Sequence, residues 1–192
     1  EPADIDAVVL SHAHLDHCAA SDVLRQQLKV PIEGPHREDS FWLEKLPEWC
    51  QMAGFPHADP FEPDPTTGLV DGDEILYVIA RSRQSTGSLV GNVVGTHMSN
   101  LGLEVALREL DIGFDRVAVG DRYILERLAG NGWTLGGEPS GHIICRDRTT
   151  TGDGIVSALQ VLAELHKTGR SLAELRAGMT KFPQELINVP LG

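Results

Sequence analysis

The chain has 192 residues, 41% hydrophobic and 23% charged, a composition typical of a soluble globular protein with one medium domain or two small ones. Its net charge of −12 argues against a nucleic-acid partner, because contacts with phosphates need clustered Lys and Arg. No apolar run approaches the ~20 residues of a membrane span, so we expect no membrane partner. The cysteines lie far apart without a CxxC pair, which favours a cytoplasmic location over a disulfide-bonded, secreted one.

The first part of the chain predicts a strand at 5–10, a helix at 15–28, a short strand in VPIEG and a helix at 38–52. The opening strand is apolar on both faces and has no element before it to pair with. We therefore expect its partners to come from upstream sequence or from another copy, in a homo-oligomer or a strand-swapped dimer. The proline-rich stretch at 54–68 predicts a linker, with domains at 1–64 and 65–192.

Beyond this linker, helical and strand patterns alternate regularly. The predicted helices lie at 73–83, 99–110, 121–130 and 153–167, and the predicted strands lie at 93–96, 114–119, 133–136 and 142–146. Strands that alternate with helices indicate parallel pairing. The sequence therefore predicts an α/β fold with a mixed, partly parallel sheet and flanking helices.

The helix at 153–167 has the strongest local signals. Asp153 is placed to cap its start and Gly169 to end it. Ser171 and Glu174 then have the spacing of a capping box that opens another short helix. The apolar residues of the long helix form one stripe, typical of an amphipathic helix: Ile155, Leu159, Leu162 and Leu165.

A cluster of metal-binding residue types follows the first predicted strand, in the segment SHAHLDH. Imidazole nitrogens and carboxylate oxygens are ligands that zinc takes in proteins. On a turn after a strand, His12 and His14 can bind one metal while Asp16 and His17 bind a second. Two metals ~3.5–4 Å apart can hold a bridging hydroxide for hydrolysis. A polar turn with incidental histidines is the alternative, but this density of ligands favours a metal site.

The segments IDAVVLSHAHLDH and VPIEGPHREDSFWLEKLPE resemble glyoxalase-II-like hydrolases of the metallo-β-lactamase superfamily, over residues 1–64. The resemblance implies a β-α-β-α fragment of that fold, with one zinc at His12 and His14 and a second at Asp16 and His17. It also implies an incomplete site, since the family's remaining ligands follow on later strands in a context that this sequence does not repeat. A thioesterase activity would then need ligands from another chain.

The rest of the chain resembles a different family. VGTHMSNLGLEVALRELDI, VGDRYILERL, GGEPSGHIICRDRTTTGDGIVSALQVL and KFPQELINV are similar to segments of phosphoglucosamine mutases, in the α-D-phosphohexomutase superfamily. GEPSGH is the most specific of these motifs. The resemblance covers residues 68–192 and corresponds to the third of the family's four domains.

The loop EPSGH offers Glu138, Ser140, the backbone of Gly141 and His142. A carboxylate and a hydroxyl can hydrogen-bond vicinal sugar hydroxyls, a histidine can reach a sugar or phosphate oxygen, and glycine lets the backbone approach a ligand. A polar hairpin turn, which Pro-Ser-Gly would also make, is the alternative from these residues alone. The resemblance implies that the loop reads an amino-sugar phosphate, glucosamine 6-phosphate or 1-phosphate.

The segment VGDRY places Asp121 at a predicted helix start with Arg122 beside it. A helix N-terminus and an arginine can together hold a phosphate. A capping aspartate next to a solvated arginine explains the same pattern equally well. Both residues are therefore candidates for substrate binding, and both alternatives stay open.

A complete mutase of this family also needs a phosphoserine, Mg²⁺ and a phosphate-binding loop, because phosphoryl transfer depends on positioning and electrostatics. The resemblance implies that those loops belong to other domains, and that the acidic turn Asp71-Gly72-Asp73-Glu74 opens a helix instead of binding Mg²⁺. We therefore expect sugar-phosphate recognition without turnover. Two other hypotheses stay open: a zinc-dependent hydrolase completed by another chain, and a recombined or engineered chimera with no evolved activity.

Overall fold

The structure is a computed structural model that describes residues 8–10, 18, 20–33, 43–54 and 71–185. The chain divides into two compact units, Glu1–Asp71 and Gly72–Gly192, and each has its own hydrophobic core. The domain boundary that the sequence predicts between residues 64 and 65 lies outside the described residues. The proline-rich linker also lies outside them, apart from Gly54.

The first unit contains a small parallel sheet in which β1 (Val8–Val9) pairs with β2 (Ile32–Glu33). The helix α2 (Ser21–Leu28) connects the two strands, and α4 (Leu46–Ala53) follows. α4 ends at Gly54, whose φ of 72° lies in the left-handed region that favours glycine. The buried core of this unit consists of Leu10, Cys18, Ile32, Leu43, Leu46 and Cys50.

Within the described residues, the second unit contains a four-stranded sheet in the order β4-β3-β5-β6. Its strands are β3 (Val93–Thr96), β4 (Phe114–Val117), β5 (Leu135–Gly137) and β6 (Ile143–Cys145). β3 pairs in parallel with both β4 and β5, whereas β6 returns antiparallel beside β5. The prediction of a mixed, partly parallel sheet is confirmed.

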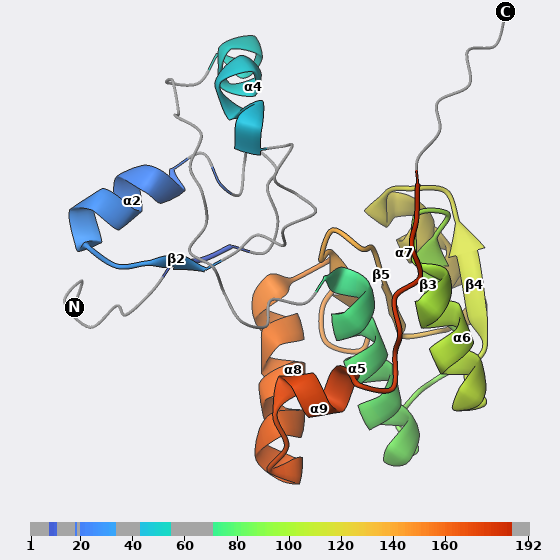
Figure 1. The fold of residues 1–192 in the computed structure, drawn as a ribbon. Coiled ribbons are helices and arrows are strands. Elements are labelled where there is room, and N and C mark those ends of the chain that lie inside the picture. The colour runs from blue at the N-terminus through green and yellow to red at the C-terminus, as the bar shows by residue number, and fades with distance from the viewer. Residues whose placement is uncertain (1–7, 11–17, 19, 34–42, 55–70, 186–192) are drawn as a thin grey trace, which may run out of the picture. The chain divides into compact units, whose positions relative to one another are not determined.

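Helices cover both faces of this sheet. α5 (Gly72–Ser85), α6 (Leu101–Glu109) and α8 (Gly154–Thr168) share one hydrophobic cluster, and α7 (Asp121–Asn131) belongs to another. Figure 1 shows α5 between α6 and α8, with the short helix α9 (Leu172–Arg176) against it. The second unit is therefore a three-layer α/β/α arrangement.

The two clusters follow from the alternation of side chains along each strand. Val93 of β3 packs with α5, α6 and α8, whereas its neighbour Val94 packs with Ile124 of α7. In β6, Ile143 belongs to the first cluster and Ile144 to the second. Strands that are apolar on both faces are expected where helices cover both sides of a sheet.

The local signals around α8 are confirmed. The side chain of Asp153 accepts a hydrogen bond from the backbone N of Val156 at 3.0 Å, and the helix ends at Gly169 with a φ of 64°. Ser171 and Glu174 form both hydrogen bonds of the predicted capping box at the start of α9. Each of these signals depends on residues within four positions of one another, so the sequence alone could specify them.

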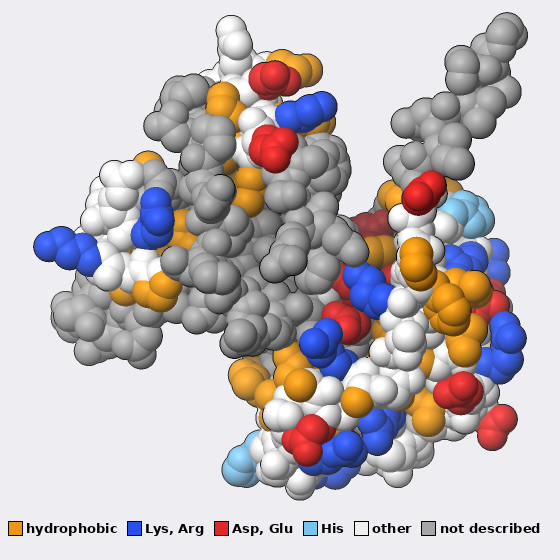
Figure 2. All heavy atoms as spheres, viewed as in Figure 1, with side chains coloured by type: hydrophobic (Ala, Val, Ile, Leu, Met, Phe, Trp, Pro, Cys, Tyr) orange, Lys and Arg blue, Asp and Glu red, His pale blue; other side chains and the backbone are white. Residues whose placement is uncertain are grey.

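Most of the apolar stripe of α8 does not face the core, although its last member, Leu165, packs against it. Ile155 is 75% exposed, and Leu159 and Leu162 are each 56% exposed. The buried residues of the helix are Ser157 and Val161. Figure 2 shows hydrophobic side chains gathered on the surface over α8. The stripe was visible in the sequence, but the side of the helix that packs depends on neighbouring elements.

The carboxyl ends of β3, β4 and β5 meet at one edge of the sheet, because these strands are parallel. The chain leaves β3 toward α6 on one face and leaves β4 toward α7 on the other. Neighbouring loops that diverge in this way open a crevice, which is the usual ligand position in open α/β sheets. Among the described residues, no helix is both long and apolar enough to cross a membrane.

Candidate functional site

The loop Glu138–His142 lies at this edge and joins β5 to β6. The backbone N of Gly141 donates to the carbonyl O of Glu138 at 3.0 Å, and the N of Glu138 donates to the O of His142 at 3.1 Å. Gly141 has a φ of 100°, which favours glycine. The alternative interpretation of this segment, a hairpin turn, is therefore confirmed for its backbone. A tight turn does not exclude a binding role, because it fixes the directions of the polar side chains.

Gly72, the first residue of α5, contacts this loop through its backbone. The N of Gly72 donates to the carbonyl O of Pro139 at 2.8 Å. A Cβ atom at position 72 would lie 2.0 Å from the O of Glu138 and 2.6 Å from the N of Gly141. Only glycine allows α5 to approach the loop this closely, which gives Gly72 a role that the sequence reading did not assign.

The start of α7 contacts the same loop. Gly120 is the N-cap residue of α7, with a φ of 126°, and its backbone N donates to Oε1 of Glu138 at 2.8 Å. Asp121 is the first residue of the helix, and no side-chain hydrogen bond caps this helix. The reading of Asp121 as a capping residue is therefore wrong, since its carboxylate lies across from the loop instead.

The side chains of Asp121, Glu138, Ser140 and His142 come together in front of the loop. Nδ1 of His142 lies 3.6 Å from Oε2 of Glu138 and 3.9 Å from Oδ1 of Asp121. The same nitrogen lies 3.3 Å from Oγ of Ser140. Glu138 is only 7% exposed, whereas the His142 side chain is 30% exposed. The cluster therefore has a fixed, buried carboxylate and a histidine that solvent reaches.

The two carboxylates of this cluster differ in pKa. Burial raises the pKa of Asp121, an effect that His142 partly opposes and Glu138 reinforces. The hydrogen bond with His142 lowers the pKa of Glu138 despite the burial of that carboxylate, and the Gly120 N–H lowers it further. Glu138 is thus held ionised and ready to accept hydrogen bonds, while Asp121 takes up a proton more readily.

Arg122 does not join the cluster. Its side chain is 81% exposed, and its Nε donates to Oε1 of Glu126 at 2.8 Å along the surface of α7. An exposed pair of this kind contributes little to stability. The structure therefore brings together five of the residues named from the sequence (Asp121, Glu138, Ser140, Gly141 and His142) and leaves Arg122 apart.

The acidic turn at the start of α5 has a structural role. Asp73 is 1% exposed, and its Oδ2 accepts a hydrogen bond from the N of Asn100 at 2.7 Å. Glu74 forms an ion pair with Arg176 of α9. Because these carboxylates hold α5 against its neighbours, they do not fit a magnesium site. This agrees with the expectation that the turn opens a helix.

The four residues of the predicted zinc cluster, His12, His14, Asp16 and His17, lie outside the described residues. Within the described part of the chain, one group of three side chains could hold a metal ion: Asp121, Glu138 and His142.

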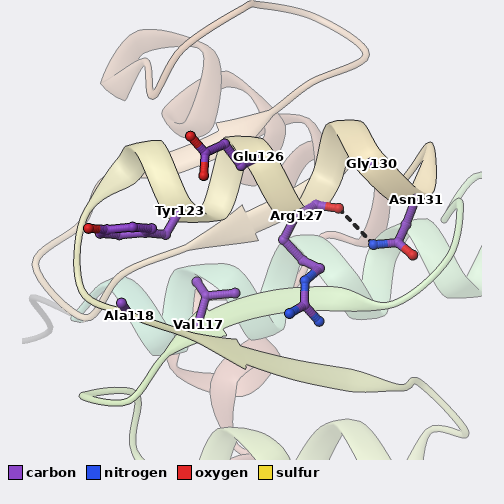
Figure 3. A pocket seen from close by; sticks show the side chains of 7 residues that line it. All are labelled: Val117, Ala118, Tyr123, Glu126, Arg127, Gly130 and Asn131. Atoms are coloured by element: carbon purple, nitrogen blue, oxygen red, sulfur yellow. Dashed lines mark hydrogen bonds between the residues drawn. The ribbon is translucent and has the colours of Figure 1, made fainter.

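A separate cavity of about 470 Å³ lies beside α7 and the end of β4. Figure 3 shows Tyr123 and Arg127 extending from α7 over this space, with Val117 on the strand below. Arg127 also pairs with Asp115 of β4 at 2.6 Å. No residue of the EPSGH loop lines this cavity, so it is distinct from the cluster.

Two family descriptions match the chain. "Phosphoglucomutase/phosphomannomutase, alpha/beta/alpha domain III" matches residues 71–182, and "Metallo-beta-lactamase superfamily" matches residues 1–90. The two matches overlap from residue 71 to residue 90, which includes all of α5. The second compact unit begins at Gly72, one residue after the start of the first match.

Curated relatives agree with the first match. The chain is 64% identical over 123 residues to phosphoglucosamine mutase of Methylococcus capsulatus, covering 64% of this chain and 28% of that protein. It is 68% identical over 121 residues to phosphoglucosamine mutase of Nitrosococcus oceani, covering 63% of this chain and 27% of that protein. The chain therefore spans little more than a quarter of the length of these relatives.

Solved structures show the same fold. N-acetylphosphoglucosamine mutase of Aspergillus fumigatus, in complex with GlcNAc-6P and magnesium, matches with a TM-score of 0.56 and 16% identity, over 97% of this chain and 52% of that one. A phosphoglucomutase/phosphomannomutase family protein of Burkholderia thailandensis matches with a TM-score of 0.54 and 16% identity, over 94% of this chain and 45% of that one.

Proposed function

The chain belongs to the phosphoglucomutase/phosphomannomutase family, and we propose that its second unit binds an amino-sugar phosphate, glucosamine 6-phosphate or 1-phosphate, at the loop Glu138–His142. The observation that carries the proposal is the convergence of Glu138, Ser140 and His142 at the carboxyl edge of the sheet. High identity to phosphoglucosamine mutases over more than 120 residues supports the choice of an amino sugar.

Each side chain has a proposed role that follows from its contacts. Oε1 of Glu138 is held by the N of Gly120, so Oε2 is left to accept a hydrogen bond from a sugar hydroxyl. Ser140 supplies a second hydroxyl contact, and the backbone of Gly141 lets the sugar approach. His142, whose side chain is 30% exposed, donates to a sugar or phosphate oxygen.

The phosphate is proposed to lie toward the start of α7. A helix N-terminus favours negative charge, and Arg122 stands in the first turn of α7, while Asp121 can donate a hydrogen bond to a phosphate when it is protonated. Because the pair of Arg122 with Glu126 is exposed and weak, the guanidinium can exchange that partner for a phosphate.

Sugar binding by this unit does not imply catalytic turnover, since the chain spans only 28% of the Methylococcus mutase. We infer that phosphoryl transfer needs the phosphoserine, Mg²⁺ and phosphate-binding loops of the family's other domains, and that this unit contributes sugar recognition. Magnesium would neutralise the transferring phosphoryl group in such a complete enzyme.

The test is binding of glucosamine 6-phosphate to the full chain, measured by titration calorimetry in the presence of EDTA. His142→Ala is expected to weaken binding about tenfold, because one charge-assisted hydrogen bond is lost. His166→Ala is the matched control, since His166 is exposed in the last turn of α8. Equal affinity of the wild type and His142→Ala, with both folded by circular dichroism, would exclude this site.

A second candidate function rests on the metallo-β-lactamase match to residues 1–90. We propose that His12, His14, Asp16 and His17 bind zinc, and that another chain supplies the ligands needed for hydrolysis of a thioester. Changing His12 and His14 together to Ala is expected to lower the zinc retained after dialysis. Unchanged zinc content would contradict this second function. The overlap of the two family matches would then be explained by the remaining hypothesis, a recombined or engineered chimera.

A further inference from the structure

Three potential metal ligands converge on one point of the candidate site. Nδ1 of His142, Oε2 of Glu138 and Oδ1 of Asp121 come from a loop and from the start of a neighbouring helix. One ligand atom from each of these residues lies within 4.8 Å of the others. In a tetrahedral zinc site with bonds of about 2.0–2.2 Å, ligand atoms lie about 3.3–3.6 Å apart. The separations of 3.6 and 3.9 Å to Nδ1 need only a small contraction.

The charge of the cluster is also unbalanced. Within the described residues, the ion-pair partner of both Asp121 and Glu138 is His142, and neither carboxylate pairs with a lysine or an arginine. Glu138 is more than nine-tenths buried, and a buried carboxylate is normally compensated by a full positive charge or a metal. When the histidine is neutral and both carboxylates are ionised, two negative charges face each other, and a divalent cation would neutralise them.

The ligands are held in place before any ion arrives. The Gly120 N–H fixes one oxygen of Glu138 and turns the other toward His142. The close approach of Gly72 fixes the backbone of the loop. Such outer contacts orient metal ligands and increase their affinity. The cost of binding is the 3.3 Å contact between His142 and Ser140, which the metal would replace.

We propose that Asp121, Glu138 and His142 form a binding site for a divalent transition-metal ion of the zinc type. One nitrogen and two carboxylate oxygens suit zinc and its neighbours, whereas Mg²⁺ prefers oxygen ligands in an octahedral arrangement. Three protein ligands leave a fourth position open to water. The site is distinct from the predicted SHAHLDH cluster, which lies outside the described residues.

The ion and the sugar phosphate compete, because Glu138 and His142 serve both. This part of the inference rests on the proposed function, whereas the metal site itself does not. Zinc would then act as an inhibitor of sugar recognition, and the sugar phosphate would weaken zinc binding by the same factor.

The experiment counts zinc ions bound to the full, metal-free chain by titration calorimetry, with cobalt absorption as a second probe of a nitrogen-containing site. His142→Gln is expected to bind about one zinc ion fewer than the wild type, or to bind it more than about tenfold more weakly. His166→Gln is expected to match the wild type. Asp121→Asn, a nearly isosteric change, serves as the second variant if His142→Gln fails to fold.

The SHAHLDH cluster does not confuse this count, because the comparison is a difference between variants that both retain it. Equal zinc binding by the wild type and by both site variants would overturn the metal proposal. Loss of the ion in the variants, without any effect of glucosamine 6-phosphate on zinc affinity, would retain the metal site and overturn the competition. Sugar binding measured in EDTA tests the proposed function independently.

Discussion

Two groups of carboxylates lie near the start of α5, and they differ in their partners. Asp73 and Glu74 are bound to a backbone N–H and to Arg176, so both serve to hold helices together. Asp121 and Glu138 face each other and a histidine. Acidic residues paired with an N–H donor or an arginine indicate a structural role, whereas acidic residues that face one another at a crevice indicate a ligand site. Composition alone does not separate these cases.

The largest effect on stability is expected from Gly72→Ala, which adds a side-chain atom where α5 contacts the loop Glu138–His142. Gly72→Ala places a Cβ atom 2.0 Å from the O of Glu138, so the loop or α5 must move. We expect a loss of about 1–3 kcal/mol in the free energy of unfolding, measured with urea, together with loss of sugar-phosphate binding.

The matched control is Gly130→Ala, at a helical position of α7 where an added Cβ meets nothing within 4 Å. This change is expected to stabilise the protein by about 0.5–1 kcal/mol. If Gly72→Ala behaves like the control, the close contact between α5 and the loop does not exist in solution.

Glu74→Gln and Glu138→Gln each remove one buried negative charge, but from different surroundings. Glu74→Gln is expected to lower the free energy of unfolding by about 1–2 kcal/mol, since Arg176 loses its charged partner, and to leave sugar affinity unchanged. Glu138→Gln is expected to weaken glucosamine 6-phosphate binding about tenfold. Calorimetry and urea unfolding of both variants measure this contrast, and a shared pattern of effects would contradict it.

The smallest effect is expected from Asp121→Asn. Burial raises the pKa of Asp121, so the folded state disfavours the ionised carboxylate and stability falls as the pH rises through that pKa. Removing the charge should therefore stabilise the protein near neutral pH by less than about 0.5 kcal/mol. The gain should vanish near about pH 3, where aspartate is protonated in both states. A gain that persists in acid would point to a cause other than ionisation.

The sequence predicted much of the second unit because its signals are local. The caps at Asp153 and Ser171 and the alternation of strands and helices are confirmed by the structure. The outward orientation of Leu159 was not predictable, since a stripe does not specify which face is covered. The contacts made by Gly72 and Gly120 join residues far apart in the chain, so no short-range pattern could reveal them.

The candidate loop could be named from the sequence, whereas its geometry could not. Resemblance identified Glu138, Ser140 and His142, but the position of Asp121 opposite His142 depends on the order of strands in the sheet. The hairpin turn, which was the alternative to sugar recognition for this segment, forms the backbone of the candidate site. The zinc ligands predicted at residues 12–17 stay a prediction.

The hydrogen bond from Gly72 to Pro139 also sets an order of events during synthesis. The chain is made from its N-terminus, so α5 emerges long before the hairpin of β5 and β6 that its first residue contacts. Until that hairpin forms, the first turn of α5 lacks this partner and β3 lacks one of its two parallel neighbours, β5. Contacts of such high sequence separation slow folding. The candidate loop is therefore completed only after α5, α6 and α7 have all been made.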